Sequence, residues 1–458
     1  MAVNCTNSLK VYKRTLSSPV DAQSVYAGLA GSCKAYLMFP GDKGGTQTMI
    51  GFNPAIQIRS REGRTERIQK GRTEVLAGDP IQILKEMTDR YRSEPGGIAK
   101  AIGYFSYDMI RSLESIGQEK ADDLGVYDTY FLFHSEFLII NENKEAAYYL
   151  LDYDHALSQA EADSLLNQRI EEIEALPQKE NAEDFQFFGF VSDTGKADFI
   201  KSVETLKHHI LEGDIFQAVL SHRLKSGYQG DPFDYFIKLC TYNQSAYRFY
   251  MDFGAYQIAG SSPERLVTVK ENKILSNPIA GTRPRGKSPV LDDDLARELL
   301  EDEKERAEHY MLVDLARNDL GKISETSSVK VTRLMEIEKY VNVMHLVSDV
   351  EGTLDKQVHF LDAVPSCLPA GTVSGAPKIR AMQLINDLET TRRGAYAGGI
   401  GYFTFDGTLD LALTIRTLVF SGGHAYLQAG AGIVHDSIPE KEWEETLHKA
   451  SGLMEAVR

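Results

Sequence analysis

The sequence predicts an α+β fold of large, mainly antiparallel sheets with helices packed outside them. Strand-like runs follow one another, and helices fall between them without the strand–helix–strand regularity of a parallel sheet. No strand is followed by the GxGxxG motif of dinucleotide-binding folds, and no GxxxxGK[ST] motif is present. The 458 residues can bury a large core and, by length, predict two or three domains.

The N-terminal part contains predicted strands and helices separated by turns. The strands are short apolar runs at residues 34–39, 102–107 and 131–140. The helices are residues 80–91, which open on a proline suited to a first helical turn, and residues 155–176. The polar segment 177–184 is the predicted linker. We therefore expect an N-terminal domain at residues 1–180 and a second domain at residues 190–458.

The second part begins with an amphipathic helix at residues 196–212, which Gly213 ends. Two further predicted helices, residues 301–320 and 439–453, each have an acidic face. The predicted strands are residues 216–224, 246–253, 258–260, 265–269, 273–275, 329–334, 341–347, 397–405, 409–419 and 425–428.

Composition and charge exclude several classes of protein. The hydrophobic fraction of 42% and the charged fraction of 25% are ordinary for a soluble globular chain. A net charge of −16 disfavours nucleic-acid binding, because the chain has no basic excess to neutralise phosphates. The longest apolar runs are too short to predict a membrane span, and the first residues lack the apolar block of a secretory signal.

The four cysteines, Cys5, Cys33, Cys240 and Cys367, are scattered without CxxC spacing. This pattern favours neither a zinc site nor a disulfide framework, and a reduced cytoplasmic protein is the simplest interpretation. None of the cysteines has the G-x-C-x-G context of a glutamine-hydrolysing nucleophile. We therefore expect no glutaminase site within the chain.

The two acidic helical faces are the most informative feature for function. Glu305 and Glu308 are three residues apart, as are Glu442 and Glu445, so each pair shares one side of its helix. Brought together, they would hold a hard cation such as partly hydrated Mg²⁺; the alternative is two solvated helix faces. Glycine-rich stretches at residues 369–378 and 428–433 suit backbone contact with a small anion. Together these features predict a metal-assisted enzyme that acts on a carboxylate substrate.

Nine sequence blocks in one order resemble those of a known family. They are residues 213–221, 260–264, 278–286, 308–319, 343–345, 369–378, 393–398, 414–417 and 428–446. With these blocks the chain resembles the chorismate-utilising enzymes, and among them the anthranilate synthase component I branch. Any one block alone is a weak signal, whereas the ordered set is specific. The N-terminal half resembles the family far less.

The resemblance implies the chorismate-binding fold and a lyase of tryptophan biosynthesis. The implied reaction is Mg²⁺-dependent conversion of chorismate and ammonia to anthranilate and pyruvate, via 2-amino-2-deoxyisochorismate. Ammonia would come from a separate glutamine amidotransferase subunit, so we expect a hetero-oligomer and no nucleic-acid or membrane partner. The alternatives are aminodeoxychorismate synthase component I, which makes 4-amino-4-deoxychorismate for folate synthesis, and a catalytically silent partner of an amidotransferase.

The resemblance also implies a set of site residues. Glu308 and Glu445 match the metal ligands, with Glu305 and Glu442 acting directly or through water. Glu264 matches the general acid that protonates the leaving C4 hydroxyl, a role that needs a raised pKa. His345 matches the base of the second step, with Thr372 nearby; the alternative for a lone histidine is a core residue. The expected substrate contacts are Gly281, Thr282, Tyr396, Arg416, Gly430, Ala431, Gly432 and Lys449.

Two positions distinguish the branches of the family. Isochorismate and salicylate synthases carry a water-activating lysine where this chain has Gln217, and many aminodeoxychorismate synthases carry a nucleophilic lysine in place of Ala280. Neither residue here supplies a base or a nucleophile, which favours direct attack by ammonia. Some aminodeoxychorismate synthases also have alanine there, so the second position separates the branches less sharply.

The chain departs from tryptophan-regulated members at both inhibitor segments. Residues 37–40 read Leu-Met-Phe-Pro where those members have Leu-Leu-Glu-Ser, and residues 47–49 read Gln-Thr-Met. Residues 243–248 read Asn-Gln-Ser-Ala-Tyr-Arg in place of Asn-Pro-Ser-Pro-Tyr-Met. We therefore expect the N-terminal domain to hold a degenerate regulatory site, with weak or absent inhibition by tryptophan.

Overall fold

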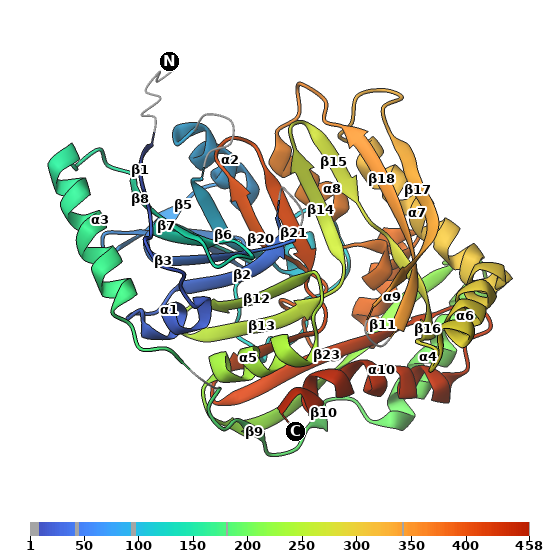
Figure 1. The fold of residues 1–458 in the computed structure, drawn as a ribbon. Coiled ribbons are helices and arrows are strands. Elements are labelled where there is room, and N and C mark those ends of the chain that lie inside the picture. The colour runs from blue at the N-terminus through green and yellow to red at the C-terminus, as the bar shows by residue number, and fades with distance from the viewer. Residues whose placement is uncertain (1–8, 42–44, 93–97, 180–181, 341–342, 458) are drawn as a thin grey trace.

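The computed structural model describes residues 9–41, 45–92, 98–179, 182–340 and 343–457 (Figure 1). Every pairing between its named strands is antiparallel, and α3 lies at one side of the sheets with α6 and α7 at the other. The prediction of an α+β fold with mainly antiparallel sheets and outer helices is confirmed. In the described residues no helix combines the length and the apolar character needed to span a bilayer.

The strands before residue 180 are β1 (Lys10–Thr15), β2 (Lys34–Pro40), β3 (Thr46–Arg61), β4 (Arg64–Gln69), β5 (Arg72–Leu76), β6 (Lys100–Phe105), β7 (Thr129–Ile140) and β8 (Ala146–Asp152). The later strands are β9 (Gln186–Phe187), β10 (Val191–Ser192), β11 (Gln217–Gln229), β12 (Tyr247–Asp252), β13 (Tyr256–Ser262), β14 (Arg265–Lys270), β15 (Lys273–Ser276), β16 (Ile279–Pro284), β17 (Lys330–Lys339), β18 (Val343–Thr353), β19 (Gly375–Ala376), β20 (Gly399–Thr404), β21 (Leu409–Leu413), β22 (Thr417–Ser421) and β23 (His424–Ile433).

The α-helices are α1 (Ala22–Gly28), α2 (Pro80–Arg90), α3 (Gln159–Glu174), α4 (Lys196–Leu211), α5 (Pro232–Tyr242), α6 (Pro289–Glu301), α7 (Glu303–Gly321), α8 (Ala363–Cys367), α9 (Lys378–Leu388) and α10 (Pro439–Met454). Short 3₁₀ helices are η1 (Tyr107–Ser112), η2 (Phe360–Asp362), η3 (Gly371–Val373) and η4 (Glu455–Val457).

Two predicted elements are divided in the structure. The acidic helix expected at residues 301–320 starts only at Glu303, because Asp302 caps it by accepting hydrogen bonds from the backbone of Lys304 and Glu305. The strand expected at residues 409–419 is broken into β21 and β22, because Arg416 adopts a left-handed φ of +51° that no strand continues through. The strand predicted at residues 341–347 includes residues 341–342, which lie outside the described residues.

Strand pairing joins the two halves of the chain. β2 pairs with β12, and β6 pairs with β20, so N-terminal strands lie between strands that follow residue 180. The expected boundary near residue 180 stays a prediction, and residues 180–181 lie outside the described part. On the other side, β11 and β23 run together along one edge of the molecule, with α10 packed against β23 (Figure 1).

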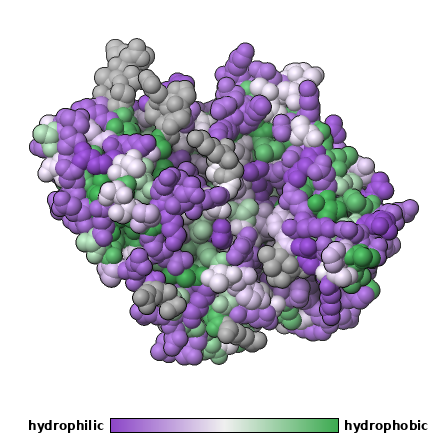
Figure 2. Space-filling model, viewed as in Figure 1, coloured by the Kyte–Doolittle hydropathy of each residue, from purple (hydrophilic) through white to green (hydrophobic). Residues whose placement is uncertain are grey.

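Successive side chains of a strand point to opposite faces of the sheet and so pack into different hydrophobic cores. In β2, Leu37 and Phe39 face one large core, whereas Tyr36 faces a second core that α1, α3 and α5 cover. A third core lies where α4 and α9 pack on β11 and β23, through residues such as Leu206 and Leu220. The outer surface in Figure 2 is largely hydrophilic, with apolar residues scattered among the polar ones.

Candidate active site

The structure brings the two acidic faces into electrostatic contact. α7 carries Glu305 and Glu308, and α10 carries Glu442 and Glu445. Burial raises the pKa of the Glu308 carboxyl, and repulsion from the other three glutamates adds to the rise. Burial also raises the pKa of Glu442, with Glu445 adding to it. Four carboxylates therefore repel one another across two helices.

This carboxylate group fits a hydrated divalent cation. Glu445 pairs with Lys449 at 2.7 Å, Glu305 lies 3.4 Å from Arg283, and Glu308 lies 3.8 Å from Lys304, which lowers the pKa of Glu308 to a smaller extent than burial raises it. In the described residues, no three of the four glutamates bring carboxylate oxygens within 4.8 Å of one another. A cation here would need water or substrate oxygens to complete its coordination shell, and Mg²⁺ bound to proteins usually keeps several water ligands.

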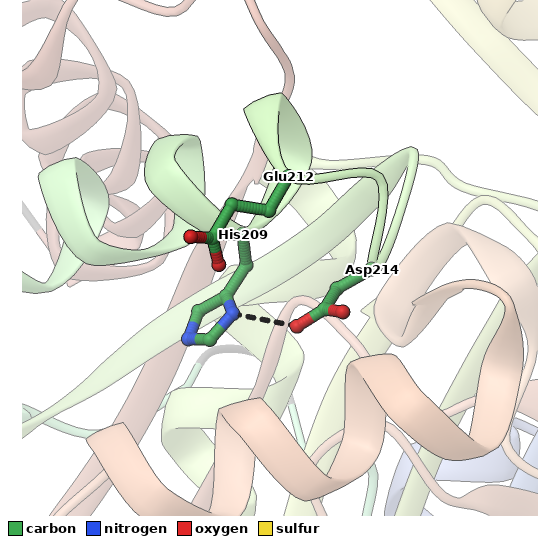
Figure 3. A group of neighbouring side chains, drawn as sticks. All are labelled: His209, Glu212 and Asp214. Atoms are coloured by element: carbon green, nitrogen blue, oxygen red, sulfur yellow. Dashed lines mark hydrogen bonds and ion pairs between the residues drawn. The ribbon is translucent and has the colours of Figure 1, made fainter.

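A tighter cluster of metal-ligating residue types lies at the end of α4. Among the described residues, only His209, Glu212 and Asp214 form a group with ligand atoms within 4.8 Å of one another (Figure 3). His209 Nδ1 lies 2.8 Å from Asp214 Oδ2, and Arg380 donates to the same oxygen at 3.0 Å. Because two partners already bind the Asp214 carboxylate, we assign this cluster to ion pairing at the protein surface.

Arg416 lies in the break between β21 and β22 and reaches α10. Its Nη1 donates to the Lys449 carbonyl at 2.6 Å, and its other N–H groups make no hydrogen bond within the described residues. Burial lowers the pKa of Arg416, which Tyr396 and Glu445 oppose, and a guanidinium remains charged at any physiological pH. The free side of this planar fork suits a carboxylate.

The glycine-rich part of β23 has an open edge beside Arg416. β23 pairs with β11 along its whole length, but with β22 only as far as Leu427. From Gln428 onward the second edge of β23 has no strand partner among the residues described. Lys449 Nζ donates to the Gly430 carbonyl on this stretch at 3.0 Å. Backbone groups and cations thus face the same space.

Glycine at positions 430 and 432 leaves room for two side chains. A Cβ at Gly430 would lie 3.0 Å from Tyr396 Oη, and a Cβ at Gly432 would lie 2.8 Å from Gln217 Nε2. Burial raises the pKa of Tyr396 to about 12, so its hydroxyl stays a neutral donor. Gln217 is buried, and its Oε1 has no hydrogen-bond partner in the described structure. An unused acceptor therefore lies against the glycine strand.

Glu264 is a buried acid just after β13. Burial raises the pKa of its carboxyl to about 8, while the Thr372 hydrogen bond and the charge of Lys449 lower it to a smaller extent. Thr372 Oγ1 donates to Glu264 Oε1 at 2.7 Å. A carboxyl with this pKa is largely protonated at neutral pH and has a proton to give to a leaving group.

His345, on β18, is a histidine held by the backbone of β16. Its Nδ1 lies 3.0 Å from the Gly281 carbonyl. Because a carbonyl only accepts, Nδ1 carries the proton in this bond, and Nε2 keeps its lone pair. Burial lowers the pKa of His345, a change that Gly281 opposes and that Arg416 and Lys449 reinforce. The ring is therefore neutral and able to accept a proton.

The structure adds a hydroxyl partner of His345 that we did not predict. The structure places Thr372 on Glu264, and it places Thr282 Oγ1 3.0 Å from His345 Nδ1. The register of β16 on β18 explains this contact, because Thr282 lies opposite His345. The predicted place of Thr372 near His345 stays a prediction, and the structure adds a hydrogen bond from Thr372 to Glu264.

Sequence reasoning missed one buried ion pair behind the site. Arg393 and Glu389 have side chains that are 1% and 6% exposed and meet at 2.6 Å. The available signal was an arginine pair followed by the small, apolar stretch Gly-Ala-Tyr-Ala-Gly-Gly. Arginine is almost never buried unless it is paired, so such a context indicates a structural or positioning role.

Comparison with known proteins identifies the family. The family described as chorismate binding enzyme matches residues 34–455. The chain belongs to this family. This chorismate-binding enzyme is 40% identical to anthranilate synthase component 1 of Acetivibrio thermocellus, over 91% of the chain and 88% of the relative. It is also 40% identical to anthranilate synthase component 1 of Lactococcus lactis subsp. lactis, over 94% and 96% of the two chains.

Solved structures show the same fold. Anthranilate synthase component I from Streptococcus pneumoniae TIGR4 superposes with a TM-score of 0.82 at 39% identity, over 96% of this chain and 99% of that one. The menaquinone-specific isochorismate synthase from Escherichia coli gives a TM-score of 0.78 at 19% identity, over 99% and 95% of the two chains, which shows the fold alone. The family predicted from the nine sequence blocks is thereby confirmed.

Proposed function

We propose that this chorismate-binding enzyme converts chorismate and ammonia to anthranilate, pyruvate and water. Ammonia attacks ring C2, both ring double bonds shift, and the C4 hydroxyl takes up a proton and leaves as water, which yields 2-amino-2-deoxyisochorismate. Removal of the C2 proton then aromatises the ring and breaks its ether bond to the enolpyruvyl group. The enolpyruvate takes up a proton to become pyruvate, so that all atoms balance.

The observation that carries this proposal is the combination of a protonated acid and a neutral base in one site. Glu264 has the proton that the departing C4 hydroxyl needs, and His345 has a free Nε2 for the C2 proton. The charge of Lys449 lowers the pKa of both Glu264 and His345, and the charge of Arg416 also lowers the pKa of His345. The relatives at 40% identity are named anthranilate synthase component 1.

The charges of the site suit the two carboxylates of chorismate. Arg416 would bind the enolpyruvyl carboxylate with help from Tyr396 and the backbone N–H groups of residues 430–432. Glu308 and Glu445 would hold Mg²⁺, with Glu305 and Glu442 acting through water. Bound there, the ion neutralises the ring carboxylate and the charge that develops during displacement.

Two neutral side chains, Ala280 and Gln217, favour direct attack on the ring by ammonia. Ala280 has no nucleophile to offer the ring, and the carboxamide of Gln217 is not a base that activates water. We propose that a separate glutamine amidotransferase subunit supplies the ammonia, since the relatives are named as component 1 of their enzyme.

The proposal is tested by incubating the purified chain with chorismate, Mg²⁺ and ammonium at mildly alkaline pH. Anthranilate fluorescence with matching release of pyruvate is the expected result. Mass spectrometry distinguishes it from an amino product that keeps its enolpyruvyl group, which would reassign the chain to 4-amino-4-deoxychorismate synthesis. Failure to consume chorismate would contradict an enzymatic role.

The exchange Arg416→Lys should raise the KM for chorismate about 10–100-fold. This factor corresponds to the loss of charge-assisted hydrogen bonds worth roughly 1.5–3 kcal/mol. Lysine keeps the charge but lacks the planar fork that binds a carboxylate through two parallel bonds. Steady-state kinetics with varied chorismate measure this, and Arg317→Lys, an exposed arginine on α7, is the matched control. An unchanged KM would show that Arg416 does not bind the substrate.

Tryptophan should inhibit this enzyme weakly or not at all. The two segments that depart from regulated relatives lie side by side, with Met38 opposite Arg248. Phe39 is fully buried there, its ring centre 4.8 Å from that of Tyr247 and 6.0 Å from that of Tyr402, so aromatic side chains already fill this space. Titration calorimetry is the direct measurement, and micromolar binding would contradict the prediction.

A further inference from the structure

Arg393 is a buried cation that the proposed chemistry does not use. Its Nε and Nη2 hold the two oxygens of Glu389 at 2.8 and 2.6 Å. Its guanidinium lies 4.6 Å from the ring centre of Tyr107 and 5.6 Å from that of Tyr396. Taking this ion pair out of water is costly unless further hydrogen bonds satisfy both partners. The structure supplies those bonds, and they all lead to the walls of the candidate site.

One of these bonds reaches the segment that carries Thr372. Arg393 Nη1 donates to the carbonyl of Val373 at 2.7 Å, at the end of η3. Thr372, the residue before it, donates to the Glu264 carboxyl at 2.7 Å. Within η3, Val373 N donates to the Ala370 carbonyl and Ser374 N donates to the Gly371 carbonyl, and from outside it Val219 N of β11 donates to the Ser374 carbonyl at 2.8 Å. Two bonds from outside therefore hold the end of η3 and with it the Thr372 hydroxyl, one from Arg393 to the Val373 carbonyl and one from Val219 N to the Ser374 carbonyl.

The remaining bonds anchor the same ion pair to β11. Arg393 Nη2 donates to the Val219 carbonyl at 2.7 Å. Glu389 Oε1 accepts from the backbone N of Ser221 at 2.9 Å and from its Oγ at 2.6 Å. In β11, Val219 and Ser221 pair with Gly432 and Gly430 of β23, and β19 pairs with the two residues before them. The ion pair thus adds a side-chain link between η3 and β11 to the backbone bond between Val219 and Ser374.

We propose that Arg393, oriented by Glu389, is a positioning residue that holds the Thr372 hydroxyl on Glu264. This inference rests on the proposed function, in which Glu264 is the general acid. Among the described residues, Arg393 has no hydrogen bond to Glu264, and its proposed effect on the acid passes through the Val373 carbonyl of η3. Lysine cannot replace it, because one ammonium on a flexible stem cannot bind Glu389 through two bonds and two carbonyls at once.

A double-mutant cycle tests the proposal. Arg393→Lys should lower kcat about 10–100-fold, because a misplacement of about 1 Å in a catalytic group costs about that much. In a Thr372→Val background the same exchange should cost no more than about twofold, the ordinary error of additivity. A merely structural role would give the full loss again in that background, and so would overturn the inference. Rates are followed as chorismate consumption, so the outcome does not depend on the product formed.

Arg392→Lys is the matched control. Arg392 is the preceding residue and is also buried, but it pairs with Asp108 and Asp128, and none of its bonds reaches η3. Its exchange should lower the melting temperature and leave kcat within about twofold of wild type. Should Arg393→Lys not fold, Glu389→Gln provides the second cycle, since it loosens the guanidinium while keeping the side-chain shape. It should show the same loss and the same non-additivity with Thr372→Val, and an unchanged kcat would overturn the inference.

A structural readout separates this inference from the proposed function. If the wild-type chain consumes no chorismate, the proposed function fails, and a crystal structure of Arg393→Lys decides the inference. Thr372 Oγ1 beyond hydrogen-bond distance from Glu264 would support the positioning role. A contact still near the wild-type 2.7 Å would overturn it.

Discussion

Glu264→Gln should lower kcat for anthranilate formation by about three orders of magnitude, within the range of about 10²–10⁴ for loss of general acid catalysis. The carboxamide keeps the shape of the side chain but has no acidic proton for the departing C4 hydroxyl. The KM for chorismate should change little, because Glu264 is a neutral group at neutral pH and is not among the proposed substrate contacts. Steady-state fluorescence assays measure both constants, and a kcat within tenfold of wild type would remove Glu264 from the acid role.

The pH dependence of the same pair gives an independent test. Burial raises the pKa of Glu264 to about 8, and the reaction needs the protonated form. The wild-type rate should therefore fall as pH rises through about 8, whereas the residual rate of Glu264→Gln should lack this limb. A limb that persists unchanged in the variant would belong to another group.

The contribution of Glu264 to the free energy of unfolding should fall as pH rises, which is opposite to the contribution of most carboxylates. Between the ordinary value of 4.5 and the folded value of about 8 for the pKa of Glu264, the unfolded chain has released this proton and the folded chain has not. Stability therefore falls as pH rises through that window, by at most about 1.4 kcal/mol per pH unit. Glutamine does not titrate, so the melting temperature of Glu264→Gln should rise relative to that of wild type between pH 5 and pH 8. A constant difference would contradict the raised pKa.

The second large effect is expected at the metal site. Glu308→Gln should lower kcat/KM about 10²–10³-fold, as expected when a metal site worth several kcal/mol of charge stabilisation is disabled. It should also raise the Mg²⁺ concentration needed for half-maximal activity. Titration calorimetry with Mg²⁺ gives the same information without turnover. Activity that keeps its normal dependence on Mg²⁺ would favour two solvated helix faces.

The same exchange should stabilise the metal-free chain. Glu308 is half-buried and its pKa is raised by burial and by three neighbouring carboxylates, so removing its charge relieves repulsion. Thermal unfolding without Mg²⁺ should therefore give a higher melting temperature for Glu308→Gln than for wild type. Glu444→Gln is the control, because Glu444 is an exposed residue of α10 between the two glutamates of the acidic face. It should change neither the Mg²⁺ dependence nor the stability.

Local sequence patterns were sufficient for elements whose cause is local. The run at residues 34–39 became β2, and the helix expected at residues 80–91 became α2 with its proline at the first turn. The helix expected at residues 196–212 ends one residue earlier, at Leu211. Alternation, proline and glycine act within a few residues, so these predictions needed no tertiary information.

Features that depend on distant contacts were not predictable in the same way. The left-handed residue Arg416 divides a strand that reads as continuous, and its guanidinium reaches a helix carbonyl 33 residues away. The register of β16 on β18, and not any local pattern, decides that Thr282 lies beside His345. The role of Arg393 appears only once Glu389, Val373 and Val219 are seen around it.

The sequence by itself determined which chemical groups the protein has for its reaction, and through its ordered blocks it determined the family. Only the tertiary structure decided their protonation states and partners. Glu264 is an ordinary carboxyl by sequence, and burial of that side chain raises its pKa to about 8. His345 is an ordinary imidazole, and burial lowers its pKa while the Gly281 carbonyl selects the tautomer. The reason is physical: a pKa measures the surroundings of a group, and those surroundings come from segments far apart in the chain.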